Sequence, residues 1–385
     1  DVDDSRVRFA LSALAAYTSC ERNEAGRKLL AGVILDVLEK GSRPEVNAFL
    51  IRQLQTCGKS EAVEPLAAFL EDERLCEPAV RALLAIRTPG AARVLGKAFP
   101  SAKGKRLVTI IKALGELGDF STAKEIKRYA AGKEPGLKWA ALYALANSGH
   151  ESAAPLLSKE LRKKAGSRRH EALSLYLLTA RRLFEKGKRE KAVNMCSGLL
   201  RSAAGKNDPH RQSMVLSTLV SLLKEKSLDF LLSALDSPDK EYRISALKTA
   251  RFIPGPYATR KWMEKAEVVN APARAEIIAM LGQRDDQTAL PAVLAALGGK
   301  DPKVRLAAIP ASARLGKDAA IPGIMGILIG GEPVEVILAR QSLLMIAGEK
   351  VIAALASSFS QLPPVSRAAA MDIFAARLAK GQLEK

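Results

Sequence analysis

The stretch DPKVRLAAIPASARLGKDAAIPGIMGILIGGEPVEVILARQSLLMIAG, residues 301–348, decides the fold because it holds one structural unit and the start of the next. Asp301-Pro302 opens the second helix of one unit, and Glu332-Pro333 opens the equivalent helix of the next, 31 residues later. Apolar residues recur at intervals of three and four in both units, which predicts helices with one buried face. Strand-like alternation is not sustained here or elsewhere in the chain.

The period of this stretch extends through the second half of the chain. Five equivalent positions follow one another at intervals of 31 residues: Arg243, Arg274, Arg305, Val336 and Arg367. Pro291 and Pro322 share that interval, and similar but less regular segments occur before residue 238. Each unit therefore reads as two helices, and we expect the arginines at these positions to be structural residues of the repeat.

Start and stop signals delimit the second helix of most units. An acidic or polar residue followed by proline stands at six predicted helix starts: Asp301-Pro302, Glu332-Pro333, Ser237-Pro238, Asp208-Pro209, Glu134-Pro135 and Glu77-Pro78. The first residue caps a free backbone N–H, and proline at the first helical position removes no hydrogen bond that the helix needs. Glycines that would end helices in the left-handed conformation are Gly118, Gly149, Gly282 and Gly316.

Helix pairs of this length, with proline in the first helix and Asp-Pro-x-x-Arg opening the second, resemble the HEAT repeat. The resemblance extends over nearly the whole chain. It implies an all-α fold, a right-handed α-α superhelix (HEAT-like helical-repeat solenoid), because one helix pair cannot bury its own apolar stripe.

Three segments are predicted within one continuous solenoid. HEAT-like repeats occupy 1–166, an irregular helical unit occupies 167–207, and regular 31-residue repeats occupy 208–385. The central unit resembles a tetratricopeptide unit at Phe184, Gly187 and Ala192; a HEAT unit with longer helices is the alternative.

The formal net charge of +19 predicts attraction to nucleic acid, anionic lipid or acidic proteins, without choosing among them. No apolar run approaches the roughly 20 residues that cross a bilayer, so we expect a soluble protein with no membrane span. The chain begins DVDD without an initiator methionine or a basic-then-apolar leader, so we expect a processed or trimmed product, which leaves an exported and a cytoplasmic protein both open.

No set of residues indicates catalysis. His150-Glu151 and His170-Glu171 begin like a zinc-protease helix, but the second ligand positions hold Ala154 and Ser174. We therefore predict no catalytic residue, no cofactor and no metal site.

Residues 159–191 are the strongest local anomaly, with twelve Lys or Arg and four Glu, a net charge of +8. The candidate residues for binding phosphates or an acidic partner are Arg162, Lys163, Lys164, Arg168, Arg169, Arg181, Arg182, Lys188 and Arg189. The alternative is a solvated surface of a generally basic protein, since few aromatic residues interleave to stack on bases.

Trp139, in LKWAALYAL, lies on a predicted second helix, whose counterparts line the concave face of HEAT proteins. An exposed tryptophan there would anchor a partner, whereas packing between repeats is the alternative.

Two longer segments carry a narrower resemblance: EVNAFLIRQLQTCGKSEAVEPLAAFLEDERLCEPAVRALLAI and LKWAALYALANSGHESAAPLL. They resemble the HEAT arrays of exported bacterial proteins in which the array precedes a β-sandwich of the 3-keto-disaccharide hydrolase type. The resemblance implies a periplasmic spacer or docking element with no hydrolytic residue to carry over.

The predicted function is therefore a non-catalytic scaffold for protein–protein interaction or for spacing an associated domain. The first rival is a nucleic-acid-binding protein that resembles HEAT-like alkylpurine DNA glycosylases and uses a basic concave face. A second is an enzyme fragment related to bilin lyases, which rests on an analogy of fold alone. The partner's identity and the oligomeric state are not predicted.

Overall fold

The computed structural model describes residues 4–20, 23–119, 121–163, 168–205 and 208–383. All regular structure in these residues is helical, which confirms the predicted all-α helical-repeat superhelix. The chain divides into two compact units, Asp1–Met195 and Cys196–Lys385, and each is described by itself.

Unit 1 consists of short helices joined by tight turns. Its α-helices are α1 (Ser5–Thr18), α2 (Glu24–Lys40), α3 (Pro44–Cys57), α4 (Val63–Ala67), α5 (Cys76–Ile86), α6 (Pro89–Ala98), α7 (Gly104–Leu117), α8 (Ala123–Ala131), α9 (Pro135–Asn147), α10 (Ala153–Arg162), α11 (Arg169–Glu185) and the first part of α12 (Arg189–Ala204). Short 3₁₀ turns are η1 (Ser60–Ala62), η2 (Ala68–Glu71) and η3 (Phe99–Ser101).

Unit 2 continues the same alternation from the second part of α12. Its further α-helices are α13 (Pro209–Leu223), α14 (Leu228–Ala234), α15 (Lys240–Ala250), α16 (Pro256–Val268), α17 (Ala271–Leu281), α18 (Leu290–Leu297), α19 (Pro302–Gly316), α20 (Ile321–Gly330), α21 (Pro333–Met345), α22 (Lys350–Ser358) and α23 (Pro364–Leu383). The 3₁₀ turns are η4 (Lys224–Ser227), η5 (Gln287–Ala289), η6 (Lys317–Ala320) and η7 (Phe359–Gln361).

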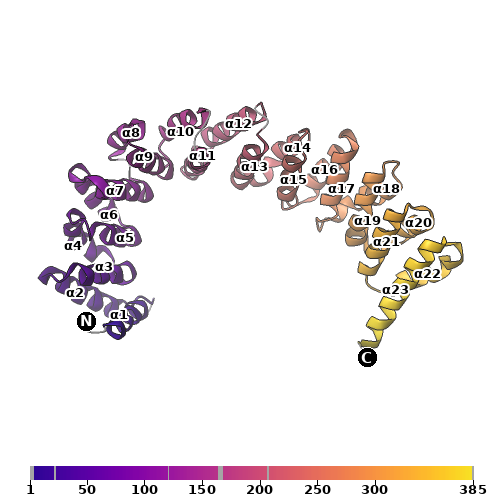
Figure 1. The fold of residues 1–385 in the computed structure, drawn as a ribbon, viewed down its shortest axis with the longest axis horizontal. Helices are drawn as coiled ribbons and strands as arrows, with labels where there is room; N and C mark the ends of the chain where they lie inside the picture. Colours follow the sequence, from indigo (N-terminus) through magenta and orange to yellow (C-terminus); the bar gives the residue numbers. More distant parts are fainter. Residues whose placement is uncertain (1–3, 21–22, 120, 164–167, 206–207, 384–385) are drawn as a thin grey trace. The chain divides into compact units, whose positions relative to one another are not determined.

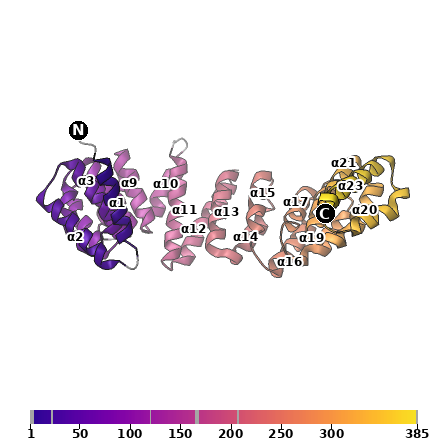
Figure 2. The same ribbon diagram turned by 90° about the horizontal axis from the view of Figure 1, so that it is seen from below.

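The helices of each unit form two rows. In unit 1 the odd-numbered helices from α1 to α11 pack in succession, and in unit 2 those from α13 to α23 do the same. Figure 1 shows them on the inner side of the curve that each unit makes, and Figure 2 shows α13, α15 and α17 side by side. We call the odd-numbered helices the inner helices, and they correspond to the predicted second helices.

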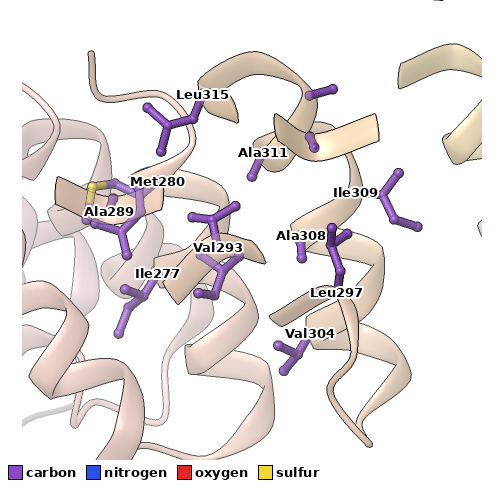
Figure 3. Close-up of a cluster of buried hydrophobic side chains, with 14 of the residues drawn as sticks. Ile277, Met280, Ala289, Val293, Leu297, Val304, Ala308, Ile309, Ala311 and Leu315 are labelled. Carbon is purple, nitrogen blue, oxygen red and sulfur yellow. The ribbon is translucent and has the colours of Figure 1, made fainter. Parts of the chain in front are cut away.

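The core lies between the two rows and between successive repeats. In unit 2, Ile277 of α17, Val293 of α18 and Ala308 of α19 are fully buried in one cluster, and Figure 3 shows their side chains meeting there. Fully burying one Val, Leu or Ile contributes about 1.5–3 kcal/mol, so each repeat is stabilised mainly by contact with its neighbours.

The capping signals locate most helix starts. The Asp301 carboxylate accepts hydrogen bonds from the backbone N–H groups of Lys303 and Val304 at 2.8 and 3.3 Å, and α19 begins at Pro302. Asp208 and Glu134 cap α13 and α9 in the same way. At Glu332, the backbone N–H donates to the Glu335 carboxylate at 3.2 Å.

Two predicted starts are wrong by one or two residues. Helix α15 begins at Lys240 rather than Pro238, because Asp239 supplies the cap and accepts from the Tyr242 N–H at 2.7 Å. Helix α5 begins at Cys76, ahead of Glu77-Pro78, because the Asp72 carboxylate accepts from the backbone N–H groups of the preceding turn.

All four predicted glycines stand at helix ends, but the left-handed conformation is wrong for two of them. Gly118 and Gly149 have φ of 71° and 65° and follow α7 and α9 in the left-handed conformation. Gly282 has φ of −65° and follows α17 without a left-handed turn, and Gly316, with φ of −90°, is the last residue of α19. A Cβ on Gly282 would lie 2.3 Å from the Cβ of Ala311, so this glycine permits the close approach of α17 to α19.

The arginines at the 31-residue spacing share one contact pattern. The Arg305 Nη1 donates to the carbonyl oxygens of Gly299 and Lys300, both at 2.9 Å, just after α18 ends. Arg243 and Arg367 likewise donate to carbonyls in or beside the turn before their own helix, and Arg274 donates to carbonyls in the last turn of α16. Each guanidinium thereby ties its helix to the end of the preceding segment.

Candidate partner-binding surfaces

The first group of basic candidates surrounds the turn between α10 and α11. The Lys163 Nζ lies 2.6 Å from Glu160, whose other oxygen accepts from Lys138 at 2.6 Å. The Arg169 Nη2 donates to the Lys163 carbonyl at 3.1 Å. Lys164 lies outside the described residues. The described cations of this turn are therefore held largely by contacts within unit 1.

Trp139 lies beside this turn on α9. Its side chain is half-buried, and the Arg168 guanidinium lies 5.4 Å from the centre of its ring. A cation over an indole face is a favourable contact, so one face of the ring is already covered. Whether Trp139 anchors a partner remains a prediction.

The second group surrounds the turn between α11 and α12. Lys188 and Lys191 both pair with Glu151, the former at 2.6 Å, and their hydrogen bonds lower the pKa of the Glu151 carboxyl to about 2. Arg182 contacts Glu185 at 2.9 Å and the Asn147 side chain at 3.0 Å. The basic side chains of this turn are therefore also held by contacts within unit 1.

Helix α11 separates the two groups. It contains 17 residues, so at 1.5 Å per residue its ends lie about 25 Å apart. Arg189, at the second turn, lies over the Phe184 ring at 5.4 Å. Among the described candidates, four exposed arginines enter no ion pair: Arg162 and Arg169 in the first group, and Arg181 and Arg189 in the second. The structure thus does not bring the basic candidates together in one patch.

The inner face of unit 1 is polar. The Tyr143 hydroxyl of α9 donates to Glu116 of α7 at 3.0 Å, and the Arg182 contact to Asn147 links α11 to α9. Burial raises the pKa of Tyr143 above its ordinary value, and the nearby Glu116 carboxylate raises it further. Exposed Arg52 and Arg81 continue this polar surface on α3 and α5.

Unit 2 has a different inner face. On α19, α21 and α23 four exposed or half-buried positions repeat at the 31-residue interval and form rows across the three helices. The rows are Lys303, Val334 and Val365; Leu306, Ile337 and Ala368; Pro310, Gln341 and Asp372; and Arg314, Met345 and Ala376. We call these twelve residues the apolar inner face, because eight of them are apolar.

The exposure of this face sets it apart from the core. Val334 is 60% exposed, Ile337 53%, Met345 56% and Val365 63%. On the same helix α21, Val336 and Leu343 are 4% and 0% exposed. The inner side of α21 therefore presents apolar side chains to solvent at the spacing of one helix face.

The sequence analysis missed this face. A valine or isoleucine at helical spacing was read as core, and the chain offers many such positions. The signal that distinguishes these positions is a comparison between repeats, because the residue equivalent to Val334 and Val365 is Lys303. The exposed lysine at this position indicates that the equivalent valines also face solvent.

Two other surface features lead to no assignment. Phe9, Tyr17 and Leu29 on α1 and α2 are exposed, and nothing in the structure indicates what covers them. A cavity of about 800 Å³ is lined by Phe99, Ser121 and Tyr129, among others.

Neither a metal-ligating cluster nor a membrane-spanning helix occurs among the described residues. In the part of the chain that the structure describes, His, Cys, Asp and Glu side chains form no group of three or more that could hold a metal ion. None of the described helices combines the length and the apolar character needed to cross a bilayer.

Residues 260–344, from within α16 to α21, match the family model of HEAT repeats. This segment contains the first two helices of the apolar inner face and lies in the most regular part of the 31-residue period. No curated protein matches the chain.

Several solved structures are similar in fold. Human deoxyhypusine hydroxylase is 19% identical, with a TM-score of 0.28 and coverage of 74% of this chain and 96% of that chain. Kap95p, solved with RanGDP, is 14% identical, with a TM-score of 0.45 and coverage of 96% and 57%. The CpcE–CpcF complex of phycocyanin lyase from Nostoc is 14% identical, with a TM-score of 0.25 and coverage of 78% and 94%.

These likenesses concern the fold alone. The predicted absence of catalysis stays a prediction. The association with a 3-keto-disaccharide hydrolase-type domain and the periplasmic location stay predictions too.

Proposed function

We propose that this chain is a non-catalytic helical-repeat scaffold that binds a protein partner through the apolar inner face of unit 2. The observation that carries the proposal is the exposure of Val334, Ile337, Met345 and Val365, each more than half accessible to solvent. Contiguous exposed apolar side chains on a soluble protein are typical of interaction sites.

The free energy available from burying these four side chains favours a specific interface. Burying one such side chain completely contributes about 1.5–3 kcal/mol, and these four are a little more than half exposed. Each would then add about 1 kcal/mol on binding, before the cost of ordering the partner. Four together are comparable to the few anchor residues that dominate a typical interface.

The charge distribution supports a protein rather than a nucleic acid as the partner. Binding to phosphates requires cations that are available to the ligand. Most described cations of residues 159–191 contact internal carboxylates, carbonyls or aromatic rings instead. On the apolar inner face only Lys303 and Arg314 are basic, and the remaining side chains offer little to a phosphate backbone.

A binding experiment tests this proposal by comparing the wild type with one double variant of the face and one single control variant. The immobilised chain is incubated with an extract of its source cells, and bound proteins are identified by mass spectrometry. Val334→Asp with Val365→Asp should remove a protein that the wild type retains. Val268→Asp is the control, because Val268 is 77% exposed at the end of α16 and lies off the face.

Circular dichroism melting checks that all variants remain folded. Identical sets of proteins on the wild type and the double variant would refute the proposal. Recovery that disappears on nuclease treatment would instead favour the nucleic-acid alternative.

A further inference from the structure

The partner segment can be specified further, on the condition that the apolar inner face is the docking surface. The first row of that face joins equivalent positions of three successive repeats: Lys303 on α19, Val334 on α21 and Val365 on α23. Successive inner helices pack directly against each other. Packed helices lie about 8–10 Å apart, so the side chains of a row are spaced by about that distance.

The apolar part of the face is narrow. The first two rows are three residues apart on each helix, which is about 4.5 Å along the helix axis. On α21 and α23 the third row is polar, with Gln341 and with Asp372, the latter 3.2 Å from Arg340. A partner that runs along the first two rows therefore meets an apolar strip bordered by polar groups.

This width selects an extended partner. An α-helix is about 10–12 Å across with its side chains, so one lying along the strip would press its flanks onto the polar third row. An extended chain covers a narrower track. The partner is thus better matched in width by an extended segment than by a helix.

The spacing of the row selects among extended conformations. A β-strand repeats the same face every two residues, about 6.6 Å, which falls short of the distance between inner helices. A polyproline II segment repeats the same face every three residues, about 9.3 Å, which matches it. Such a segment keeps one side chain over each inner helix as it crosses α19, α21 and α23.

The charge at one end of the row completes the pattern. Lys303 is exposed, and no described residue forms an ion pair with it. An acidic side chain over Lys303 would precede or follow the two apolar side chains over Val334 and Val365, according to the direction of the partner chain.

We propose that the first row binds a polyproline II segment of the partner in which an acidic residue and two apolar residues stand at successive intervals of three. The pattern is acidic-x-x-apolar-x-x-apolar, read in either direction. Three residues of this chain, spaced by 31 residues in sequence, would thereby contact a seven-residue segment of the partner.

The experiment is a selection from a displayed library of random 12-residue peptides on the full chain. Parallel selections use the Val334→Asp, Val365→Asp double variant and the Val268→Asp control. Enriched peptides should show the period of three with the acidic residue, should persist with Val268→Asp and should be lost with the double variant.

A charge reversal tests the acidic position separately. With Lys303→Glu, the affinity of an enriched peptide should fall about fivefold, the upper range for one exposed ion pair. A peptide with Lys in place of the acidic residue should recover that loss. Melting curves check that Lys303→Glu is folded.

The outcomes separate the two proposals. Peptides that depend on Val334 and Val365 but show apolar residues at intervals of two, or of three and four, would overturn the polyproline II segment and leave the docking surface standing. Enriched peptides without a preferred acidic residue would likewise overturn the proposed segment and leave the docking surface standing. A library without any peptide sensitive to the double variant would overturn both.

Discussion

Replacing Gly282 by alanine tests whether the repeats of unit 2 pack as closely as the structure indicates. A Cβ on Gly282 would lie 2.3 Å from the Cβ and 2.5 Å from the Cα of Ala311. Carbon atoms in ordinary contact are about 3.5–4.0 Å apart, so α17 and α19 would have to separate by about 1 Å or more. That movement would also loosen neighbouring core contacts of both helices.

Overpacking of this kind costs about 1–3 kcal/mol, and the higher helix propensity of alanine returns at most about 1 kcal/mol. We therefore expect Gly282→Ala to lower the free energy of unfolding of unit 2 by about 1–2 kcal/mol. With an m-value of about 2 kcal/mol/M in urea, the unfolding midpoint falls by about 0.5–1 M.

Tryptophan fluorescence during urea unfolding measures this change. Trp262 is fully buried in unit 2, so the background variant Trp139→Phe leaves a reporter for that unit alone. Gly326→Ala is the matched control, because a Cβ on Gly326 would meet no atom within 4 Å. The control should be neutral or stabilising. A midpoint for Gly282→Ala that equals or exceeds that of Gly326→Ala would refute the close approach of α17 to α19.

Three further predictions concern charged side chains. Arg305→Leu removes the 2.8 Å contact to Glu335, whose side chain is 5% exposed. Because this leaves a buried carboxylate without its partner, urea unfolding should show unit 2 destabilised by about 3 kcal/mol. Adding Glu335→Gln should recover part of that loss, and no recovery would contradict a role for the ion pair. The folded-state pKa of Glu151 is lowered to about 2, so its stabilising contribution is present above about pH 4.5 and is lost as the pH falls toward 2. The melting temperature of the wild type should therefore decline more steeply over that range than the melting temperature of Glu151→Gln. Since internal contacts hold most cations of residues 159–191, duplex DNA should be bound with a slope of log affinity against log salt shallower than about −3, and a gel-shift series giving a steeper slope would favour the nucleic-acid alternative.

The regular parts of the fold could be predicted because their signals are local. The 31-residue interval from Arg243 to Arg367 located the repeats of unit 2, and Asp301 located the start of α19. Asp301 acts on backbone groups two and three positions away, and the 31-residue interval can be read from the sequence directly, so neither signal requires knowledge of how the repeats pack.

The failures concern contacts between repeats. Gly282 looks like a helix stop in the sequence, and only its distance to Ala311 reveals a packing glycine. The ion pairs of the basic segment were also not predicted, because Glu151, which pairs with Lys188 and Lys191, lies 37 and 40 residues away; whether the segment binds an anion stays a prediction. Such partners depend on how successive helices stack, and the sequence does not state this.

The rows of the apolar inner face also bear on how such a protein changes over evolutionary time. Each repeat contributes one residue to each row, so substitution of Lys303 alters one position of the recognised segment without disturbing Val334 or Val365. An in-frame duplication of one 31-residue unit would lengthen every row by one side chain. A new specificity can then arise by copying a unit and editing one exposed position in it, while the buried arginine and glycine contacts are inherited unchanged.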